Sequence, residues 1–181
     1  MKILLIQPPA RRVEYESIVV PPLGLAYLAA SLERKGYDVK ILDAFALRQS
    51  WGDFEEAVKA AGADIIGIGG MTPVIDSTYR AFKICRKYCK HLIFGGPHAT
   101  IFKDNILNEA SEVDFVVYGE GEETFAELID GLNSKNGVSG VAGTVDRHAV
   151  NSPRPLIQDL DGLPFPSRHL LPNHCYNYIF A

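Results

Sequence analysis

The sequence lacks the motifs that mark several common classes of protein. Its 181 residues contain no G-x-G-x-x-G loop after the first apolar segment and no G-K-[ST] tripeptide, so neither a dinucleotide loop nor a Walker loop is expected. There is no G-x-S-x-G elbow of a serine hydrolase. No apolar run reaches about 18 residues, and Met1-Lys2 leads into an apolar strand without a cleavable signal. We therefore expect a cytoplasmic protein without a membrane span.

Cysteine and basic charge are also scarce. Three cysteines and no secretion signal favour reduced thiols. Cys85 and Cys89 lie four apart on an expected helix, so they either share a metal or pack as small hydrophobic side chains; we favour packing and expect no metal site. The net charge of -4 argues against nucleic acid as the main partner, because phosphate binding needs a concentrated basic surface.

What the sequence does contain is a repeated pattern of strands and helices. Apolar runs rich in β-branched residues alternate with segments of helical period, which predicts βα units around a parallel sheet. The expected strands are 2–7, 38–43, 65–69, 92–94 and 115–118, and the expected helices are 23–35, 54–61, 74–88, 101–110 and 122–132. We predict an α/β fold with a doubly wound, five-stranded parallel sheet in the order 2-1-3-4-5, flavodoxin-like or Rossmann-like.

Local chemistry supports several of these boundaries. Gly36 follows the apolar positions of the first helix, as a C-terminal cap does. Thr72 precedes a proline and is expected to cap the third helix, while Asp76 places negative charge near its positive end. The second strand, which ends at Asp43, is the one strand end without glycine or paired proline, and we expect it at the sheet edge.

The sequence pattern of the chain changes after Gly137. Residues 140–150 predict a small hairpin, and frequent prolines then prevent a regular element. We therefore divide the chain into an α/β domain, 1–137, and a hairpin with a Pro-rich linker, 138–181.

The other four strands end in loops that contain glycine or paired proline. The clearest are Phe94-Gly95-Gly96-Pro97-His98 and Tyr118-Gly119-Glu120-Gly121-Glu122, and the others are Gln7-Pro8-Pro9 and Gly69-Gly70-Met71-Thr72. Glycine lets a ligand approach the main chain, and parallel strands end at one edge of a sheet. The pattern predicts a ligand site at that edge.

Two charged or titratable groups in these loops have more than one interpretation. His98 is an acid, a base or a ligand, or else its ring caps the following helix or packs on Phe102. Glu120 and Glu122 are a general acid and base, or else Glu122 starts the last helix, where a carboxylate complements the helix dipole.

The chain resembles the N-terminal cobalamin-binding domain of B12-dependent radical SAM enzymes, which include methyltransferases and the anaerobic oxidative cyclase of bacteriochlorophyll synthesis. The resemblance covers nearly the whole chain. It rests on Gln7-Pro8-Pro9, Pro22-Leu23-Gly24-Leu25, Asp43, Asp64-Ile65-Ile66-Gly67-Ile68, Gly95-Gly96-Pro97-His98-Ala99-Thr100, Gly119-Glu120-Gly121-Glu122 and the tail Asp161-Gly162-Leu163-Pro164-Phe165-Pro166.

The resemblance implies cobalamin as cofactor and a set of residues that bind it. The nucleotide tail of the cofactor is expected beside strands 4 and 5, and the corrin near the ends of strands 1 and 3. The cofactor-binding residues implied are Pro8, Pro9, Leu23, Gly24, Met71, Thr72, Gly95, Gly96, Pro97, His98, Tyr118, Gly119, Glu120, Gly121 and Glu122.

Two departures from the family pattern limit what this chain does alone. The D-x-H-x-x-G motif is absent, so cobalt is expected without a protein histidine ligand; Arg11, Arg12, Glu14 and Tyr15 are candidates for its lower face. A C-x3-C-x2-C motif is also missing, because Leu92 stands where the third cysteine is required after Cys85 and Cys89.

The [4Fe-4S] cluster and S-adenosylmethionine are therefore expected only in a C-terminal radical SAM domain of the full-length protein, the expected partner of this module. No catalytic residues are assigned in this chain, and it is expected to be inert alone. Two alternatives stay open: a docking module that has lost the cofactor, and a stand-alone enzyme with His98 and Glu120 as acid and base.

Overall fold

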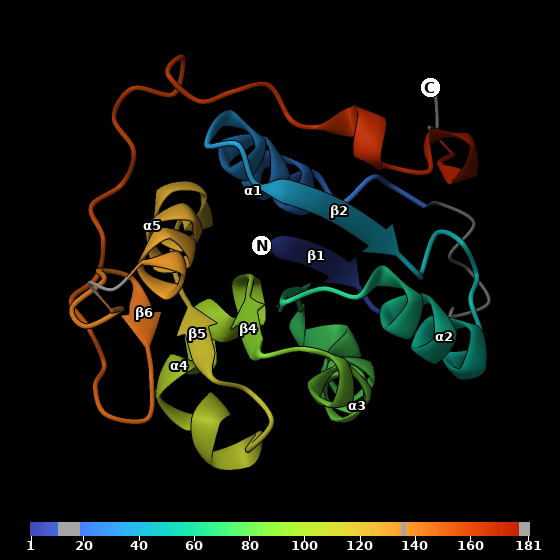
Figure 1. The fold of residues 1–181 in the computed structure, drawn as a ribbon, viewed down its shortest axis with the longest axis horizontal. Coiled ribbons are helices and arrows are strands. Elements are labelled where there is room, and N and C mark those ends of the chain that lie inside the picture. The colour runs from blue at the N-terminus through green and yellow to red at the C-terminus, as the bar shows by residue number, and fades with distance from the viewer. Residues whose placement is uncertain (11–18, 135–136, 178–181) are drawn as a thin grey trace.

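A mixed sheet forms the centre of the protein, between two layers of helices (Figure 1). The computed structural model describes residues 1–10, 19–134 and 137–177, and within them the strand order is β2-β1-β3-β4-β5-β6. The strands are β1 Lys2–Gln7, β2 Asp38–Asp43, β3 Ile65–Gly69, β4 His91–Gly95, β5 Phe115–Val117 and β6 Thr144–Val145. β1 to β5 run parallel and β6 is antiparallel to β5. The prediction of a five-stranded sheet therefore missed one strand, β6.

The added strand comes from the segment expected to form a separate hairpin. Thr144 and Val145 pair with Val117 and Val116, so β6 joins the main sheet. The chain then turns back, with a bridge between Val145 and Val150. A two-residue strand carries too little periodic pattern to be recognised as an extension of a sheet.

Within the described residues, five α-helices cover the two faces of the sheet. They are α1 Leu23–Arg34, α2 Trp51–Ala61, α3 Ile75–Cys85, α4 Pro97–Glu109 and α5 Gly121–Asn133. One buried cluster joins the sheet to α2, α3 and α4, and another joins it to α1 and α5. Figure 1 shows these two layers on opposite sides of the strands. No described helix is long and apolar enough to cross a membrane.

The alternating residues of β3 give its two faces different characters. Ile66 and Ile68 are buried in the cluster with α2, α3 and α4. Ile65, Gly67 and Gly69 point the other way, toward α1 and α5. Successive side chains of a strand alternate between faces, so two glycines in this register leave the centre of one face without side chains.

Helix ends follow local chemistry in most places. Gly36, just beyond α1, has a φ of 82°, a value that glycine adopts without strain. Ser50 forms a capping box with Asp53 at the start of α2. Thr72 does not cap α3 as expected; it begins a 3₁₀ turn, Thr72–Val74, that precedes the helix, while Asp76 does lie in the first turn of α3.

α4 begins earlier than its apolar pattern suggested. Pro97 occupies the first turn, where its missing N–H does no harm, and the backbone departs from helical geometry at Phe102. This kink interrupts the apolar period, which is why the sequence alone placed the start at residue 101.

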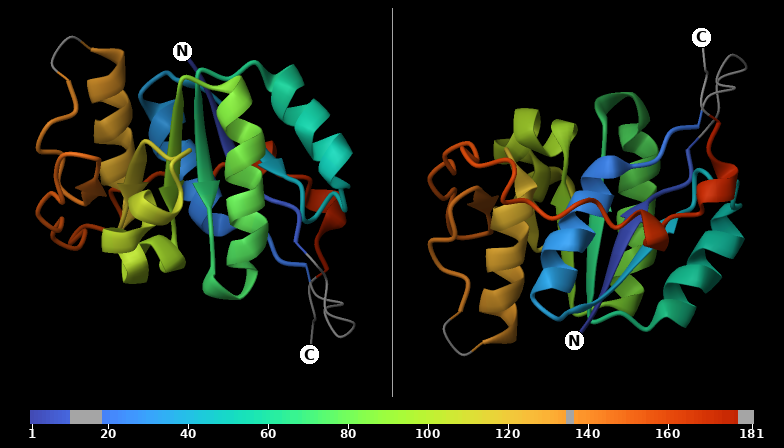
Figure 2. Two further views of the ribbon diagram at one scale, coloured as in Figure 1. Left: turned by 90° about the horizontal axis from the view of Figure 1, so that it is seen from below. Right: turned by 90° about the horizontal axis from the view of Figure 1, so that it is seen from above.

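The proline-rich tail lies against the domain instead of projecting from it. Figure 2 shows it crossing α1 on the way from β6 to the C-terminal region. The amide of Ser167 donates to the carbonyl of Ala26 at 3.0 Å, and Arg34 donates to the carbonyl of Gly162 at 2.8 Å. Further along, the Tyr176 hydroxyl donates to buried Asp43 at 2.8 Å. Backbone and side-chain hydrogen bonds therefore hold the tail along its length.

Candidate functional site

A groove of about 440 Å³ lies between α1 and α5 and opens at the carboxyl ends of the strands. Its floor is formed by β1, β3, β4 and β5, which contribute Leu5, Gly67, Ile93 and Val117 among others. Leu25 and Leu28 of α1 line one side, and Phe125 of α5 lines the other. Mostly apolar walls, a few polar groups and this volume are typical of a small-molecule or cofactor site.

Two glycines of β3 bring the side chains of the walls close to the floor of the groove. A Cβ built on Gly67 would come within 2.9 Å of Leu5 Cδ2 and 3.0 Å of Phe125 Cζ, and one on Gly69 would come within 3.3 Å of Leu25 Cδ2. Real Cβ atoms almost never come closer than about 3 Å to other heavy atoms, because packing is already dense in a protein interior. A side chain at position 67 would therefore displace Leu5 or Phe125, and one at position 69 would press on Leu25, so glycine at both positions lets the walls of the groove pack directly on its floor.

The ends of β3 and β4 approach each other more closely than side chains would allow. Gly96 has a φ of 103°, and a Cβ there would lie 3.0 Å from the carbonyl oxygen of Gly70. The amide of Gly70 donates to the carbonyl of Gly95 at 3.0 Å. Glycine at position 96 is thus needed for the backbone itself, whereas Gly95 is needed only for the space above it.

The loop after β5 forms the wall nearest to α5. Gly119 has a φ of 75°, and its amide donates to Thr100 Oγ1 at 3.1 Å. A Cβ on Gly121 would lie 3.2 Å from Leu28 Cδ2, across the groove. Gly121 begins α5 and thus lets that helix start close to α1.

The expected site residues separate into two groups. The groove is lined by Gly24, Met71, Gly95, Gly96, Pro97, Gly119, Glu120, Gly121 and Glu122. The others, which do not line it, are Pro8, Pro9, Leu23, Thr72, His98 and Tyr118. Glu122 lies in the first turn of α5, as expected of a carboxylate near a helix N-terminus.

The six residues outside the lining have identifiable positions. Pro8 and Pro9 are buried directly after β1, and Leu23 is exposed at the first residue of α1. Tyr118 belongs to the cluster on the opposite face of the sheet, where its hydroxyl donates to the carbonyl of Asn151. Successive residues of a strand face opposite sides, so Val117 enters the groove and Tyr118 does not.

His98 also turns away from the groove. Its ring is buried, with its centre 4.5 Å from that of Phe102, and its Nδ1 lies 3.1 Å from Thr72 Oγ1. Burial lowers the pKa of His98 from its usual 6.5, so the imidazole is neutral at neutral pH. The interpretation in which the ring packs on Phe102 is confirmed.

The two cysteines on α3 and after it lie in or beside the core. Cys85 is buried, and burial raises the pKa of its thiol, while burial raises the pKa of Cys89 to about 11. Both thiols are protonated at neutral pH and pack as hydrophobic groups. The candidates for the lower face of cobalt, Arg11, Arg12, Glu14 and Tyr15, lie outside the described residues.

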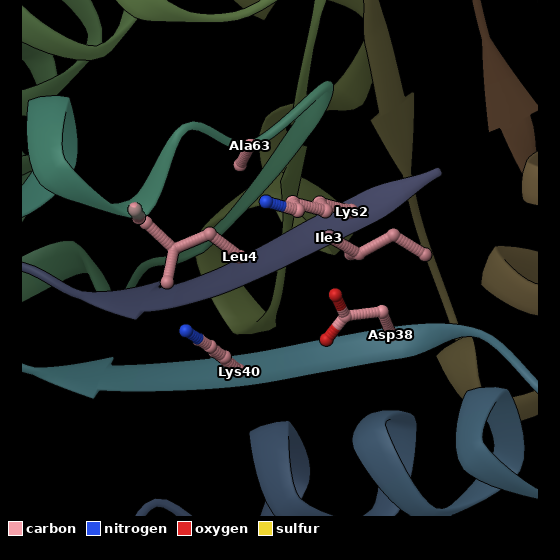
Figure 3. A pocket seen from close by; sticks show the side chains of 7 residues that line it. Lys2, Ile3, Leu4, Asp38, Lys40 and Ala63 are labelled. Atoms are coloured by element: carbon pink, nitrogen blue, oxygen red, sulfur yellow. The ribbon is translucent and has the colours of Figure 1, made fainter.

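A second hollow lies at the opposite edge of the sheet. Figure 3 shows it between the first residues of β1 and β2, beside Lys2, Asp38, Lys40 and Ala63. Its volume of about 10 Å³ is enough for roughly one water molecule. This hollow is therefore far too small to hold a cofactor.

Sequence reasoning missed the floor of the groove. Gly67 lies within the predicted strand 65–69 and was not predicted as a site residue, yet Gly67 and Gly69 are two residues apart and so share a face. Leu25, Leu28 and Phe125 lie within the predicted helices 23–35 and 122–132 and were not predicted as site residues either. The available signal was the spacing of two glycines within one strand, which predicts a bare strip along the sheet.

Comparison with known proteins agrees with this geometry. Residues 17–129 match the model of the B12 binding domain family. The chain is 38% identical to an uncharacterized methyltransferase of Pyrococcus horikoshii, over 97% of this chain and 40% of that protein. It is 35% identical to the anaerobic magnesium-protoporphyrin IX monomethyl ester cyclase of Synechocystis, over 89% of this chain and 34% of that protein. The chain thus spans well under half the length of these relatives.

Solved structures share the fold at lower identity. The radical S-adenosylmethionine methyltransferase TsrM from Kitasatospora setae, solved with cobalamin and a [4Fe-4S] cluster bound, matches with a TM-score of 0.70 and 18% identity over 84% of this chain and 30% of that one. The cobalamin-dependent S-adenosylmethionine radical enzyme OxsB, solved with aqua-cobalamin and S-adenosylmethionine, also matches with a TM-score of 0.70, at 17% identity over 92% of this chain and 24% of that one.

The structural matches establish the fold, and the family model, which covers more than half of the chain, establishes the family. The resemblance stated from the sequence motifs is confirmed by both. This chain belongs to the B12-binding domain family.

Proposed function

We propose that the chain is the cobalamin-binding module of a B12-dependent radical SAM enzyme. The observation that carries this proposal is the mostly apolar groove of about 440 Å³ at the carboxyl edge of the sheet, whose floor includes Gly67, Gly69 and Gly95. Cobalamin combines a broad corrin with a long nucleotide tail. A narrow slot beneath an open mouth fits that combination.

The residues of the chain fit the two parts of the cofactor differently. The tail enters the groove along Gly67, Gly95 and Gly121, where added side chains would take the same space. The corrin lies over the mouth, against exposed Met71 and Leu23. Burial of these apolar surfaces supplies affinity at roughly 25 cal/mol per Å².

The groove orients the cofactor and keeps water from its tail. Bound cobalamin supplies a cobalt that accepts and passes on a methyl group. No histidine lines the groove among the described residues, and the ring of His98 packs on Phe102 outside it. We therefore keep the proposal that cobalt is held without a protein histidine ligand.

The division of the protein into parts is proposed on the same basis. Residues 1–137 form the binding domain, and 138–181 lead toward a radical SAM domain that carries the [4Fe-4S] cluster and S-adenosylmethionine. The greater length of the relatives supports this arrangement. β6 and the tail contacts with α1 then fix the start of that connection on the binding domain.

Titration with hydroxocobalamin tests the proposal. A stoichiometric complex with a shifted visible spectrum is expected. A protein that stays folded but binds no hydroxocobalamin at high micromolar concentration would instead support a docking module without cofactor. Turnover of a substrate without any cofactor would support a stand-alone enzyme.

A further inference from the structure

The ends of β3 and β4 are joined by a small set of contacts beside the mouth of the groove. Gly70 donates to the carbonyl of Gly95 at 3.0 Å, and His98 donates through its amide to the carbonyl of Gly70 at 3.3 Å. The third contact joins side chains, Thr72 Oγ1 to His98 Nδ1 at 3.1 Å. Between Gly70 and Thr72 lies Met71, which lines the groove.

These contacts among Gly70, Gly95, Thr72 and His98 are called the joint below. The ring of His98 is also packed against two phenylalanine rings. His98 is 7% exposed, with its ring 4.5 Å from that of Phe102 and 6.3 Å from that of Phe94. Both phenylalanines are apolar and oppose a charge on the imidazole. The charged group that acts on it is Glu109, at the end of α4, which accepts a hydrogen bond from Tyr79 of α3 at 2.6 Å.

We propose that His98 is a positioning residue for the cobalamin groove. Its neutral imidazole fixes the hydroxyl of Thr72, and through Thr72 it fixes the rim that carries Met71. The inference rests on the proposed function, since the rim matters only if cobalamin lies against it. The His98 side chain does not line the groove and acts through its contact with Thr72.

The joint is expected to depend on pH in one direction. Burial lowers the pKa of His98 below 6.5, while the charge of Glu109 opposes this more weakly. A group whose pKa is lowered in the folded state contributes stability at pH values above its unfolded pKa. That stability is lost as the pH falls through the folded pKa. Cobalamin affinity should therefore weaken as the pH falls below 6.5 and through the lowered pKa of His98.

Four variants test the proposal by hydroxocobalamin titration at about pH 7. Thr72→Val and His98→Phe each remove the side-chain hydrogen bond, and each should weaken binding about fivefold. The double variant should be no weaker than the weaker single variant, because both changes remove the same contact. His98→Asn keeps a polar atom near the position of Nδ1 and should stay within about threefold of wild type.

A pH series separates positioning from general stability. As the pH falls from 6.5 through the lowered pKa of His98, wild type should lose affinity while His98→Asn should not, because the amide does not titrate. His148→Asn, an exposed histidine change in the hairpin turn, should behave as wild type. Thermal unfolding confirms that each variant is folded, and Thr72→Val, at an exposed position, decides the matter if His98→Phe does not fold.

Two results would overturn the inference while leaving the proposed function intact. One is additive losses in the double variant, and the other is a pH profile that His98→Asn does not change. If folded wild-type protein fails to bind hydroxocobalamin, the proposed function fails, and this inference fails with it.

Discussion

The carboxylate of Glu120 accepts the backbone N–H of Ile157 at 2.6 Å. Glu120 lines the groove, whereas Ile157 belongs to the proline-rich tail. Nearby, Arg154 of the tail donates to Thr124 at 2.8 Å and pairs with Glu127, both on α5. The tail is therefore attached to the same loop and helix that wall the groove.

Removal of this carboxylate should loosen the tail. We expect Glu120→Ala to lower the free energy of unfolding by about 1 kcal/mol, since a half-buried hydrogen bond to a charged acceptor is lost. Hydrogen exchange at the Ile157 amide should become faster. Glu120→Gln keeps an acceptor oxygen and should show a smaller change at the same amide. Unaltered exchange in Glu120→Ala would refute the attachment.

The floor of the groove should not accept a side chain at position 67. Gly67→Ala places its methyl within 3.0 Å of Phe125 and closer still to Leu5, so it should cost about 1–3 kcal/mol of stability. Gly52→Ala on α2 is the matched control, because its Cβ lies 3.7 Å from its nearest neighbour, Ser50 Oγ. That control should be neutral or stabilising by up to about 1 kcal/mol, as measured by urea unfolding.

Substitutions of Gly95 should weaken cobalamin binding while changing stability little. A Cβ there makes only ordinary contacts, 3.5 Å to the carbonyl of Val117 at the closest, and the rest of a larger side chain enters the groove. Gly95→Leu should therefore unfold within about 1 kcal/mol of wild type and bind cobalamin at least about tenfold more weakly. Gly95→Ala should lie between the two. Gly96 is a poorer choice, because its positive φ makes any substitution a folding defect.

Asp43 should give stability a pH dependence opposite to that of an ordinary salt bridge. Burial raises its pKa from 3.8, although the amide of Ala46 and the hydroxyl of Tyr176 donate to the carboxylate. The folded state then holds its proton more tightly than the unfolded state, so this contribution to stability is fully present below the unfolded pKa and is lost as the pH rises through the folded pKa.

Asp43→Asn should therefore gain stability relative to wild type as the pH rises above about 4. Urea midpoints across this range measure the difference, and Asp161→Asn, at an exposed position in the tail, serves as the control. A difference between Asp43→Asn and wild type that does not vary with pH would show that Asp43 ionises freely in the folded protein.

The sequence predicted the elements better than the surfaces they build. β1, β2 and β3 have the predicted bounds. β1 and β3 are marked by continuous apolar runs, and β2 is marked by β-branched and apolar residues between two aspartates. β6 was not recognised as part of the sheet, since two residues carry no period. The path of the tail also escaped prediction, because contacts such as Arg34 with Gly162 join residues far apart in the chain.

The candidate site was predicted at its rim and missed at its floor. The glycine-rich strand ends predicted Gly95 and Gly119 as site residues, and both line the groove. Tyr118, next to Gly119, faces the other side of the sheet, and the ring of His98, in the first turn of α4, packs on Phe102 outside the groove. The motif identifies the loop, and the direction of each side chain decides which of its residues can meet a ligand.

The most direct test of the groove as the seat of the nucleotide tail is a comparison of two corrinoids. Cobinamide has the corrin but lacks the nucleotide, so it should leave the strip above Gly67 and Gly95 unfilled. We predict that the protein binds cobalamin at least about tenfold more tightly than cobinamide, and that Gly95→Leu removes this preference. Equal affinity of wild type for both corrinoids would contradict the assignment of the groove.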